Sequence, residues 1–392
     1  MKIESVDFFY LSMPVVTTEA DGSQDALLVR VRAGGYEGWG ECEAAPLPSI
    51  AAFVCPMSHG ACRPVCDSVL GRPLNGPDDI AAIGKLVEYD SMDLLQAPHT
   101  LSGIEMALWD ALGKARGEPV WSLIGYKQSH RKIPYASLLF GDTPEETLER
   151  GRTARASGFT AGKFGWGPIG RGTVQQDADH FAAAREGIGP DGHLMVDVGQ
   201  IFGEDVDAAA ARLPALEAAK VRWFEEPFHA SAIEAYGALG ALGSPVKTAG
   251  GEGAHNIYMA RHLIAQGNIG YVQIDAGRIG GIGPSKAVAD LAVASGITYV
   301  NHTFTSHLAL SASLQPYAGL EDHVICEYPA APKQLAIDIT RNHIERDADG
   351  HVRAPATPGL GMEIDVAALK PYVVDTEIRV KGKVLYATPA LD

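Results

Sequence analysis

The sequence has few basic residues and no long apolar run. Its 32 lysines and arginines are outnumbered by 48 aspartates and glutamates, giving a formal net charge of −16 at pH 7. So acidic a chain is a poor partner for nucleic acid or an anionic membrane, because both attract basic surfaces. No run of eighteen apolar residues occurs, and the N-terminus lacks the apolar core of a signal peptide. We therefore expect a cytoplasmic protein that binds neither nucleic acid nor a membrane.

Cysteine is also scarce, and the odd count of five fits a reducing compartment. One segment, "CPMSHGACRPVC", brings Cys55, His59, Cys62 and Cys66 close together in sequence. It could form a zinc site, but the paired Cys-x-x-Cys knuckle of structural zinc sites is missing. We favour a helix face on which these cysteines are buried. A hydrolytic zinc barrel is also disfavoured, because the chain has no His-x-His.

The apolar fraction of 46% is sufficient, at 392 residues, for a large core. Residues 1–125 have the pattern of an α+β unit, with a hairpin turning at Gly34-Gly35 and a helix over Ser102–Arg116. Residues 126–355 alternate short apolar runs with alanine-rich helical segments, which predicts a parallel sheet covered on both faces. Residues 356–392 lack this alternation of strand and helix patterns, and we expect them to pack back on residues 1–125.

The apolar runs of the second unit end in ionisable residues at regular intervals. Steps of 23 to 28 residues, about one βα unit each, separate successive members of the series Asp197, Glu225, Glu252, Asp275, His302 and Glu327. In a closed barrel the carboxyl ends of all strands meet at one mouth, whereas in an open sheet they spread along a line. A ring of ionisable groups therefore favours a (β/α) barrel of the TIM type.

Three carboxylates, Asp197, Glu225 and Glu252, follow three successive strands. Without a cation they would repel one another and raise one another's pKa. Oxygen ligands with no paired cysteine or histidine indicate Mg²⁺, which keeps positions open for substrate oxygens. The alternative is that each acid is a helix N-cap or a surface charge, and three in succession make that interpretation weaker.

The remaining members of the ring have the chemistry of an acid–base site. Asp275 and His302 end neighbouring strands, so the aspartate could orient the imidazole and raise its basicity. Glu327 completes the ring. Strand alternation places Lys163 toward the barrel interior, where we expect it to face a substrate, and the loop after it begins with Trp166, a further expected substrate contact.

These residues resemble the enolase superfamily, in its mandelate racemase-like branch. The resemblance extends over nearly the whole chain and rests on "GWGE", "GIEMALWDALGKARGEPVWSLIG", the three metal positions, "DAGRIGGI", "NH" and the late Glu327. It implies an α+β N-terminal capping domain over a (β/α)7β barrel. It further implies Mg²⁺ on Asp197, Glu225 and Glu252, a His302–Asp275 base, and Glu327 donating a hydrogen bond to the substrate carboxylate.

Two positions depart from the pattern of that branch. The usual Lys-x-Lys after the second barrel strand is Lys163 and Gly165 here, and the usual Asn after the first metal ligand is Gly199. The missing lysine removes the usual second base opposite His302. The resemblance therefore shifts toward acid-sugar dehydratases such as the rhamnonate dehydratase-like group.

The expected activity is thus a Mg²⁺-dependent hydro-lyase that converts a polyhydroxy carboxylate to a 2-keto-3-deoxy acid. His302 would remove the α-proton and return it to the departing β-hydroxyl. The alternatives are a racemase or epimerase of the same superfamily, a non-catalytic sugar-acid binding protein, and a nucleotide-binding open sheet using "DAGRIGGIGPSK". The last is disfavoured because no Gly-Lys-Ser/Thr follows the glycines. We expect a homo-oligomer whose substrate pocket is shaped by loops near Met13–Asp25 and Cys42–Arg63.

Overall fold

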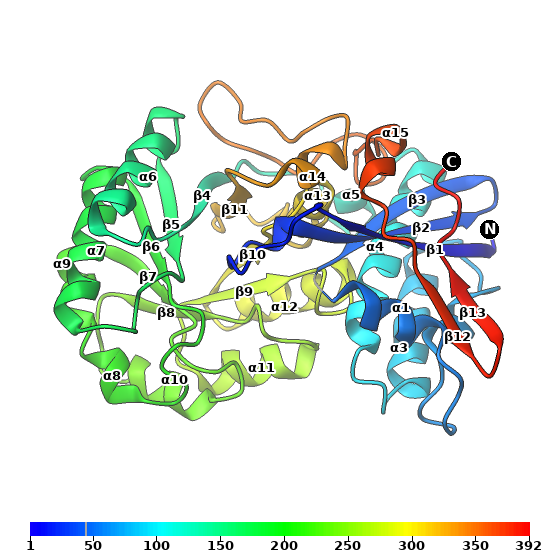
Figure 1. Ribbon diagram of the computed structural model, residues 1–392, viewed down its shortest axis with the longest axis horizontal. Helices are drawn as coiled ribbons and strands as arrows, with labels where there is room; N and C mark the ends of the chain where they lie inside the picture. Colours follow the sequence, from blue (N-terminus) through cyan, green and yellow to red (C-terminus); the bar gives the residue numbers. More distant parts are fainter. Residues whose placement is uncertain (44) are drawn as a thin grey trace.

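The computed structural model describes residues 1–43 and 45–392. Figure 1 shows two parts side by side, a barrel of parallel strands with outer helices and a smaller α+β part that carries both chain termini. The predicted TIM-type barrel with an α+β N-terminal cap is therefore confirmed. No helix within these residues combines the length and apolar character needed to cross a bilayer.

The cap is a three-stranded antiparallel sheet in the order β1-β2-β3, covered by helices. Its elements are β1 (Ile3–Ser12), β2 (Asp25–Ala33), β3 (Tyr36–Cys42), α1 (Pro46–Val54), α2 (Val65–Val69), α3 (Pro77–Asp90), α4 (Ala97–Arg116) and α5 (Val120–Leu123). The hairpin turn at Gly34-Gly35 is as predicted, and α4 begins five residues before the predicted start at Ser102.

The "GWGE" segment forms β3 because α4 lies directly against it. A Cβ added at Gly40 would meet the carbonyl oxygen of Gly103 at 2.1 Å, and one at Gly38 would meet that of Ala107 at 2.0 Å. Only glycine permits so close an approach of helix and strand. The packing fixes the end of β3, where Glu41 and Glu43 reach the barrel.

The barrel contains eight parallel strands in the order β10-β9-β8-β7-β6-β5-β4-β11. The strands are β4 (Ile133–Leu139), β5 (Ala161–Gly165), β6 (His193–Asp197), β7 (Val221–Glu225), β8 (Lys247–Gly250), β9 (Tyr271–Asp275), β10 (Thr298–His302) and β11 (Ile325–Pro329). The helices around them are α6 (Pro144–Ala156), α7 (Val174–Ile188), α8 (Val206–Ala210), α9 (Leu213–Ala218), α10 (Ile233–Gly240), α11 (Ile257–Gln266), α12 (Ile282–Ala294), α13 (His307–Leu314) and α14 (Gln334–Asp338).

One side chain joins the two outer strands of this sheet, β10 and β11. Asn301 on β10 donates from Nδ2 to the carbonyl oxygen of Glu327 at 3.3 Å and accepts from the backbone N–H of Glu327 at 2.9 Å. Tyr317 donates to the same amide oxygen at 2.8 Å. In the described residues, β10 and β11 are the two ends of the hydrogen-bonded strand order, and the Asn301 amide links them in place of backbone pairing. It thereby holds Glu327 beside His302.

Strand alternation separates two layers of core, as the sequence pattern indicated. Inside the barrel lies a small cluster of buried residues: Tyr135, Ala161, Met195, Trp223, Ala249, Val300 and Ile325. The main core between strands and helices continues into the cap and includes Phe164. Lys163 therefore lies on the interior face between Ala161 and Gly165, opposite Phe164.

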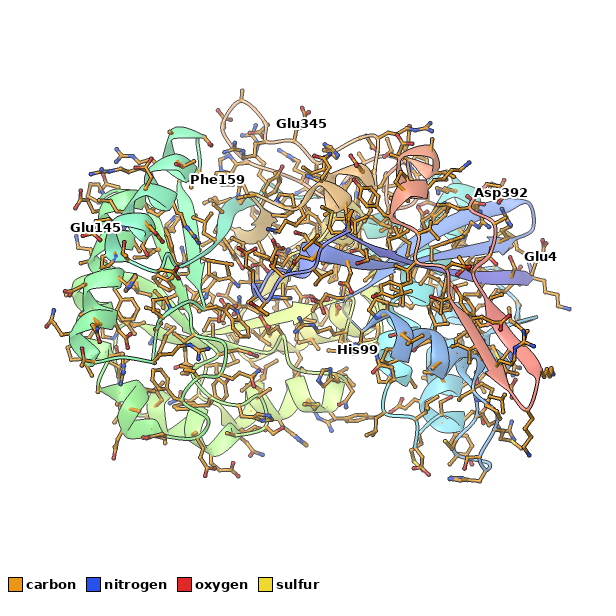
Figure 2. The ribbon with its side chains drawn as sticks, viewed as in Figure 1. Glu4, His99, Glu145, Phe159, Glu345 and Asp392 are labelled. Carbon is orange, nitrogen blue, oxygen red and sulfur yellow. The ribbon has the colours of Figure 1, made fainter. Side chains whose placement is uncertain are left out.

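The C-terminal segment contains α15 (Val366–Leu369) and the hairpin of β12 (Glu377–Val380) and β13 (Lys383–Ala387). Figure 1 shows this red hairpin beside the helices of the cap. The Tyr386 hydroxyl donates to the carbonyl oxygen of Phe8 at 2.8 Å, and Arg30 donates to Asp392 at 3.1 Å. In Figure 2, Asp392 and Glu4 accordingly lie at the same end of the molecule.

The cysteine-rich segment forms neither a zinc site nor the buried helix face that we favoured. Cys55, Cys62 and Cys66 are free and only half-buried, and His59 and Cys62 face each other in a short non-helical bridge. Pro56 and Pro64 interrupt the helical pattern, so α1 ends before Cys55 and α2 starts after Pro64. Within residues 1–43 and 45–392, the single group of three metal-ligating side chains lies elsewhere.

Candidate active site

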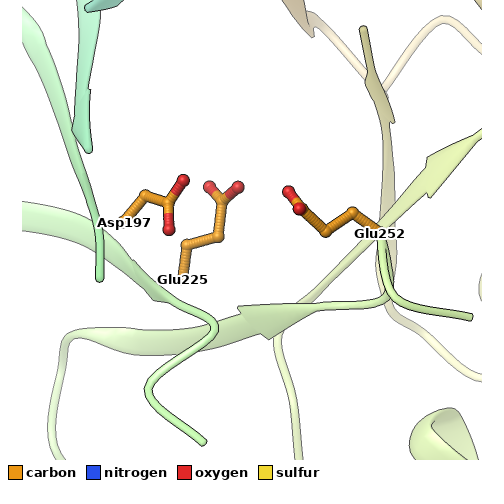
Figure 3. A group of neighbouring side chains, drawn as sticks. All are labelled: Asp197, Glu225 and Glu252. Carbon is orange, nitrogen blue, oxygen red and sulfur yellow. The ribbon is translucent and has the colours of Figure 1, made fainter. Parts of the chain in front are cut away.

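Three acids lie at the carboxyl ends of neighbouring barrel strands. Asp197 ends β6, Glu225 ends β7, and Glu252 follows the end of β8 by two residues. One oxygen from each lies within 4.8 Å of the other two. Figure 3 shows the three carboxylates pointing toward a common space, with Glu252 facing the other two. The predicted convergence is therefore present in the fold.

The three acids differ in their pKa shifts. Burial, followed by the charge of Glu225, raises the pKa of Asp197 well above its ordinary value. Burial also raises the pKa of Glu225, and Glu252 adds to that shift, although Lys163 opposes it. Burial opposes ionisation of Glu252 too, but His302 and Arg278 outweigh it and lower the pKa.

These acids fit a hard divalent cation. Their donor atoms are all carboxylate oxygens, they converge, and burial together with mutual repulsion disfavours the charge of two of them. Magnesium accepts one or a few carboxylates and keeps further positions for water or substrate. Asp197, Glu225 and Glu252 are therefore the residues that would hold Mg²⁺.

Lys163 projects from β5 into the acid cluster. Its Nζ lies 2.6 Å from Glu225 Oε1, 3.1 Å from Glu327 Oε1 and 3.7 Å from Asp197 Oδ2. Burial disfavours the ammonium, but Glu225 and Glu327 outweigh it and hold the pKa of Lys163 well above its ordinary value. The side chain is therefore a cation at neutral pH, suited to stabilising negative charge.

His302 lies between two acids of the ring. Its Nδ1 is 2.6 Å from Asp275 Oδ2, and its Nε2 is 3.0 Å from Glu252 Oε2. Asp275 is held in turn by the backbone N–H of Gly277, which donates to Oδ1 at 2.6 Å. Burial disfavours the imidazolium, but Glu252 and Glu327 outweigh it and raise the pKa of His302 well above its ordinary value. The paired Asp275 and His302 thus have the arrangement of an oriented base.

Glu327 lies within β11 rather than at its end, and both of its oxygens accept hydrogen bonds. The Ser137 hydroxyl donates to Oε1 at 2.8 Å, and the backbone N–H of Thr303 donates to Oε2 at 2.7 Å. Donation to a substrate carboxylate would require Glu327 to be protonated. That role remains a prediction, whereas its place between Lys163 and His302 is a feature of the structure.

A cavity of about 300 Å³ opens over these groups. Its floor carries Lys163, Asp197, Glu252, His302 and Glu327. The wall includes the predicted Trp166, and Asp21 and Glu43 come from the two loops, near Met13–Asp25 and Cys42–Arg63, that were expected to shape the pocket. The wall residues that the sequence did not predict are Ser137, Leu138, Leu139, Arg278 and Phe304.

Two of these wall residues also had a signal of their own in the sequence. Glu43 lies two residues after Glu41, so strand alternation continued past the end of β3 places both side chains on the same side of the chain. Arg278 stands inside "DAGRIGG", three residues after Asp275. Ser137 gave no such signal, because nothing in a serine within an apolar strand indicates its partner across the barrel.

Gly199, where the resembled branch has Asn, makes room for Trp166. A Cβ at Gly199 would lie 2.8 Å from the indole ring, and the residue has φ of +52°. Trp166 itself adopts φ of +58°, and its backbone N–H donates to the carbonyl oxygen of Asp197 at 3.1 Å. The glycine therefore lets the indole pack against the backbone two residues after Asp197.

Substituting Gly199→Ala tests this contact against a matched control. Gly203 has a similar φ of +61° but no atom within 4 Å of an added Cβ. We expect both Gly→Ala variants to lose about 1–2 kcal/mol in urea unfolding, from backbone strain alone. We expect only Gly199→Ala to change tryptophan fluorescence and raise KM, because only there must the indole move. Identical fluorescence in the two variants would contradict the contact.

Comparison with known proteins assigns the family. Residues 9–125 match the N-terminal domain of mandelate racemase / muconate lactonizing enzyme, and residues 146–368 match the enolase C-terminal domain-like family. The chain belongs to the enolase superfamily.

Individual relatives span several reactions. A D-galactarolactone cycloisomerase from Agrobacterium fabrum is 30% identical over 86% of this chain and 88% of its own. A D-galactonate dehydratase from Variovorax paradoxus is 28% identical over 84% of this chain and 86% of its own. A crystal structure named as a predicted mandelate racemase from Rhodobacter sphaeroides is 70% identical, with a TM-score of 0.96 over 99% of this chain and 100% of that one.

Proposed function

We propose that this protein is a Mg²⁺-dependent acid-sugar dehydratase, a hydro-lyase that forms a 2-keto-3-deoxy acid from a polyhydroxy carboxylate. The observation that carries the proposal is the asymmetry of the site. An oriented imidazole, His302, stands on one side of the acid cluster, and Gly165 lies beside Asp197 on another. The similarity to sugar-acid dehydratases supports the same reaction.

Asp197, Glu225 and Glu252 would hold the cation. Bound there, Mg²⁺ would stabilise negative charge on the substrate carboxylate and, by competing for Glu252, lower the pKa of His302 toward that of a base.

His302 performs both proton transfers in this proposal. Asp275 accepts from Nδ1, which leaves Nε2 as the atom that removes the α-proton of the substrate. The C–H electron pair passes into the carboxylate, giving an enediolate. The imidazolium then returns its proton to the β-hydroxyl as the C–O bond breaks and water leaves. Because one group serves both steps, the elimination is syn, and the enol product tautomerises to the 2-keto acid.

Lys163 stabilises the enediolate in this account and does not act as a base. Its three acidic neighbours keep it protonated. Lys163→Ala should lower kcat by about 10²- to 10³-fold, the effect of removing one preorganised donor. Steady-state kinetics measure the loss, with circular dichroism to confirm folding and the exposed Lys127→Ala as control. A Lys163→Ala variant of wild-type kcat would contradict the assignment.

A racemase or epimerase is the second candidate, favoured by the name of the 70% identical structure. It needs a proton donor opposite His302, and among the cavity residues Lys163 is the candidate. A non-catalytic binding protein would hold the acid without exchanging its α-proton.

The direct experiment is a screen of C4–C6 aldonates and aldarates with Mg²⁺ for formation of a 2-keto acid. We expect at least one acid to be dehydrated, and no reaction in excess chelator. A protein that binds these acids but neither dehydrates them nor exchanges their α-proton would contradict the proposal.

A further inference from the structure

The cap contributes one wall of the cavity, and that wall is acidic. Asp21 and Gly22 come from the loop before β2, and Glu43 follows β3. The backbone N–H of Glu43 donates to the carbonyl oxygen of Gly277 at 3.3 Å, so this residue is pinned to the barrel just beyond Asp275. The wall therefore has a fixed position relative to the base.

Glu43 is a carboxylate with one oxygen already hydrogen-bonded to Arg278 and the other oxygen without a protein donor among the described residues. Its Oε2 accepts from Arg278 Nε at 2.6 Å. Burial disfavours the carboxylate, but Arg278 outweighs it and lowers the pKa of Glu43. Oε1 faces Gly22, where an added Cβ would lie 3.5 Å away. No donor to Oε1 is found among residues 1–43 and 45–392, so this oxygen remains able to accept from a ligand.

The positive charge of Arg278 is already balanced. Besides Glu43, the guanidinium lies 3.3 Å from Glu252 Oε1. Its side chain is 19% exposed, compared with 10% for Glu43, so little of either charge is screened by water. A second anionic group arriving here would meet an arginine already paired with two carboxylates. Asp21, on the same wall, adds little repulsion because Lys333 Nζ lies 3.5 Å from its Oδ2.

A substrate held by its carboxylate near Lys163 and the clustered acids can extend its other end toward this wall, which lines the same cavity. Hydroxyl groups can donate to Glu43 Oε1, whereas a second carboxylate would place two negative charges together in a poorly hydrated cavity. Such like-charge repulsion is an effective means of excluding a competing ligand.

We propose that Glu43 is a specificity-determining residue that selects monocarboxylic acid sugars, the aldonates, and excludes the dicarboxylic aldarates. This inference rests on the proposed function, because it assumes that the cavity holds an acid sugar by its C1 carboxylate. Glu43, a residue of the cap, would thus determine whether the distal end of the substrate must be neutral or can be anionic.

The test compares substrate pairs that differ only at the distal carbon, beginning with galactonate and galactarate. Both binding, by calorimetry with Mg²⁺, and kcat/KM are measured. We expect the wild type to favour the aldonate at least tenfold by both measures. Glu43→Gln keeps the shape, removes the charge and leaves Arg278 with Glu252 as its remaining carboxylate partner, so the preference should fall at least tenfold.

Two further variants make the result specific. Glu43→Asp keeps the charge and should retain the preference for the aldonate. Glu37→Gln, on β3 and away from the cavity, should behave as wild type. Equal or tighter binding of the aldarate by the wild type, or an unchanged preference in Glu43→Gln, would overturn the inference. Clear discrimination in binding without turnover of either acid would sustain it and contradict the proposed dehydratase instead.

Discussion

His302→Asn should abolish both dehydration and α-proton exchange while substrate binding persists. Asparagine can still donate a hydrogen bond but cannot take up the proton, so the step that starts the reaction is lost. General-base removal typically costs about 10²- to 10⁴-fold, and the loss here should lie at or above the upper end because the same group serves both transfers. Exchange is followed by NMR in D₂O, and binding by calorimetry.

Two comparisons identify the cause of that loss. Asp275→Asn should slow both reactions by orders of magnitude, because Nδ1 loses the carboxylate at 2.6 Å that orients and charges the ring. His262→Asn, at an exposed position on α11, should leave the rates unchanged. Wild-type exchange in His302→Asn would mean that another residue, with Lys163 the first candidate, is the base.

Glu225→Gln and Glu252→Gln should each remove activity and the stabilisation that Mg²⁺ gives to the folded protein. A ligand that binds only the folded state raises its stability with ligand concentration. We therefore expect the melting temperature of the wild type to rise with Mg²⁺ and that of either variant to stay nearly constant.

The two substitutions should differ in their effect on the metal-free protein. Glu225→Gln removes a carboxylate whose pKa is raised in the fold and relieves repulsion on Asp197, so it should cost little stability through charge. Glu252→Gln removes a carboxylate whose pKa His302 and Arg278 lower, so it should reduce stability at neutral pH. Magnesium-free buffer with excess chelator provides the second part of the test, in which the wild type should be inactive. Full activity there, or a Mg²⁺-induced shift retained in both variants, would contradict the assigned metal site.

Much of the fold could be predicted because the sequence carries two periodicities. Apolar runs spaced by one βα unit predicted the barrel, and period-two alternation predicted the interior position of Lys163. The acids at strand ends followed from the same spacing. The exceptions are Glu252, two residues past β8, and Glu327, inside β11, since strand ends depend on pairing with neighbours.

The remaining features depend on contacts between distant parts of the chain. The Glu43–Arg278 pair joins residues 235 positions apart, and the Asn301 amide joins β10 to β11. The room that Gly199 leaves for Trp166 depends on a loop conformation with positive φ. In the cysteine-rich segment, Pro56 and Pro64 indicate breaks between helices, and these breaks override the apolar pattern that predicted a buried helix face.

The most direct test of the one-base dehydratase follows the C2 epimers of a substrate acid by NMR, each incubated with enzyme and Mg²⁺ in D₂O. The account predicts that only the epimer presenting its α-proton to His302 reacts, that it yields a 2-keto-3-deoxy acid, and that the opposite epimer never appears. Appearance of the opposite epimer from either acid would show a second base across the site and would contradict the account.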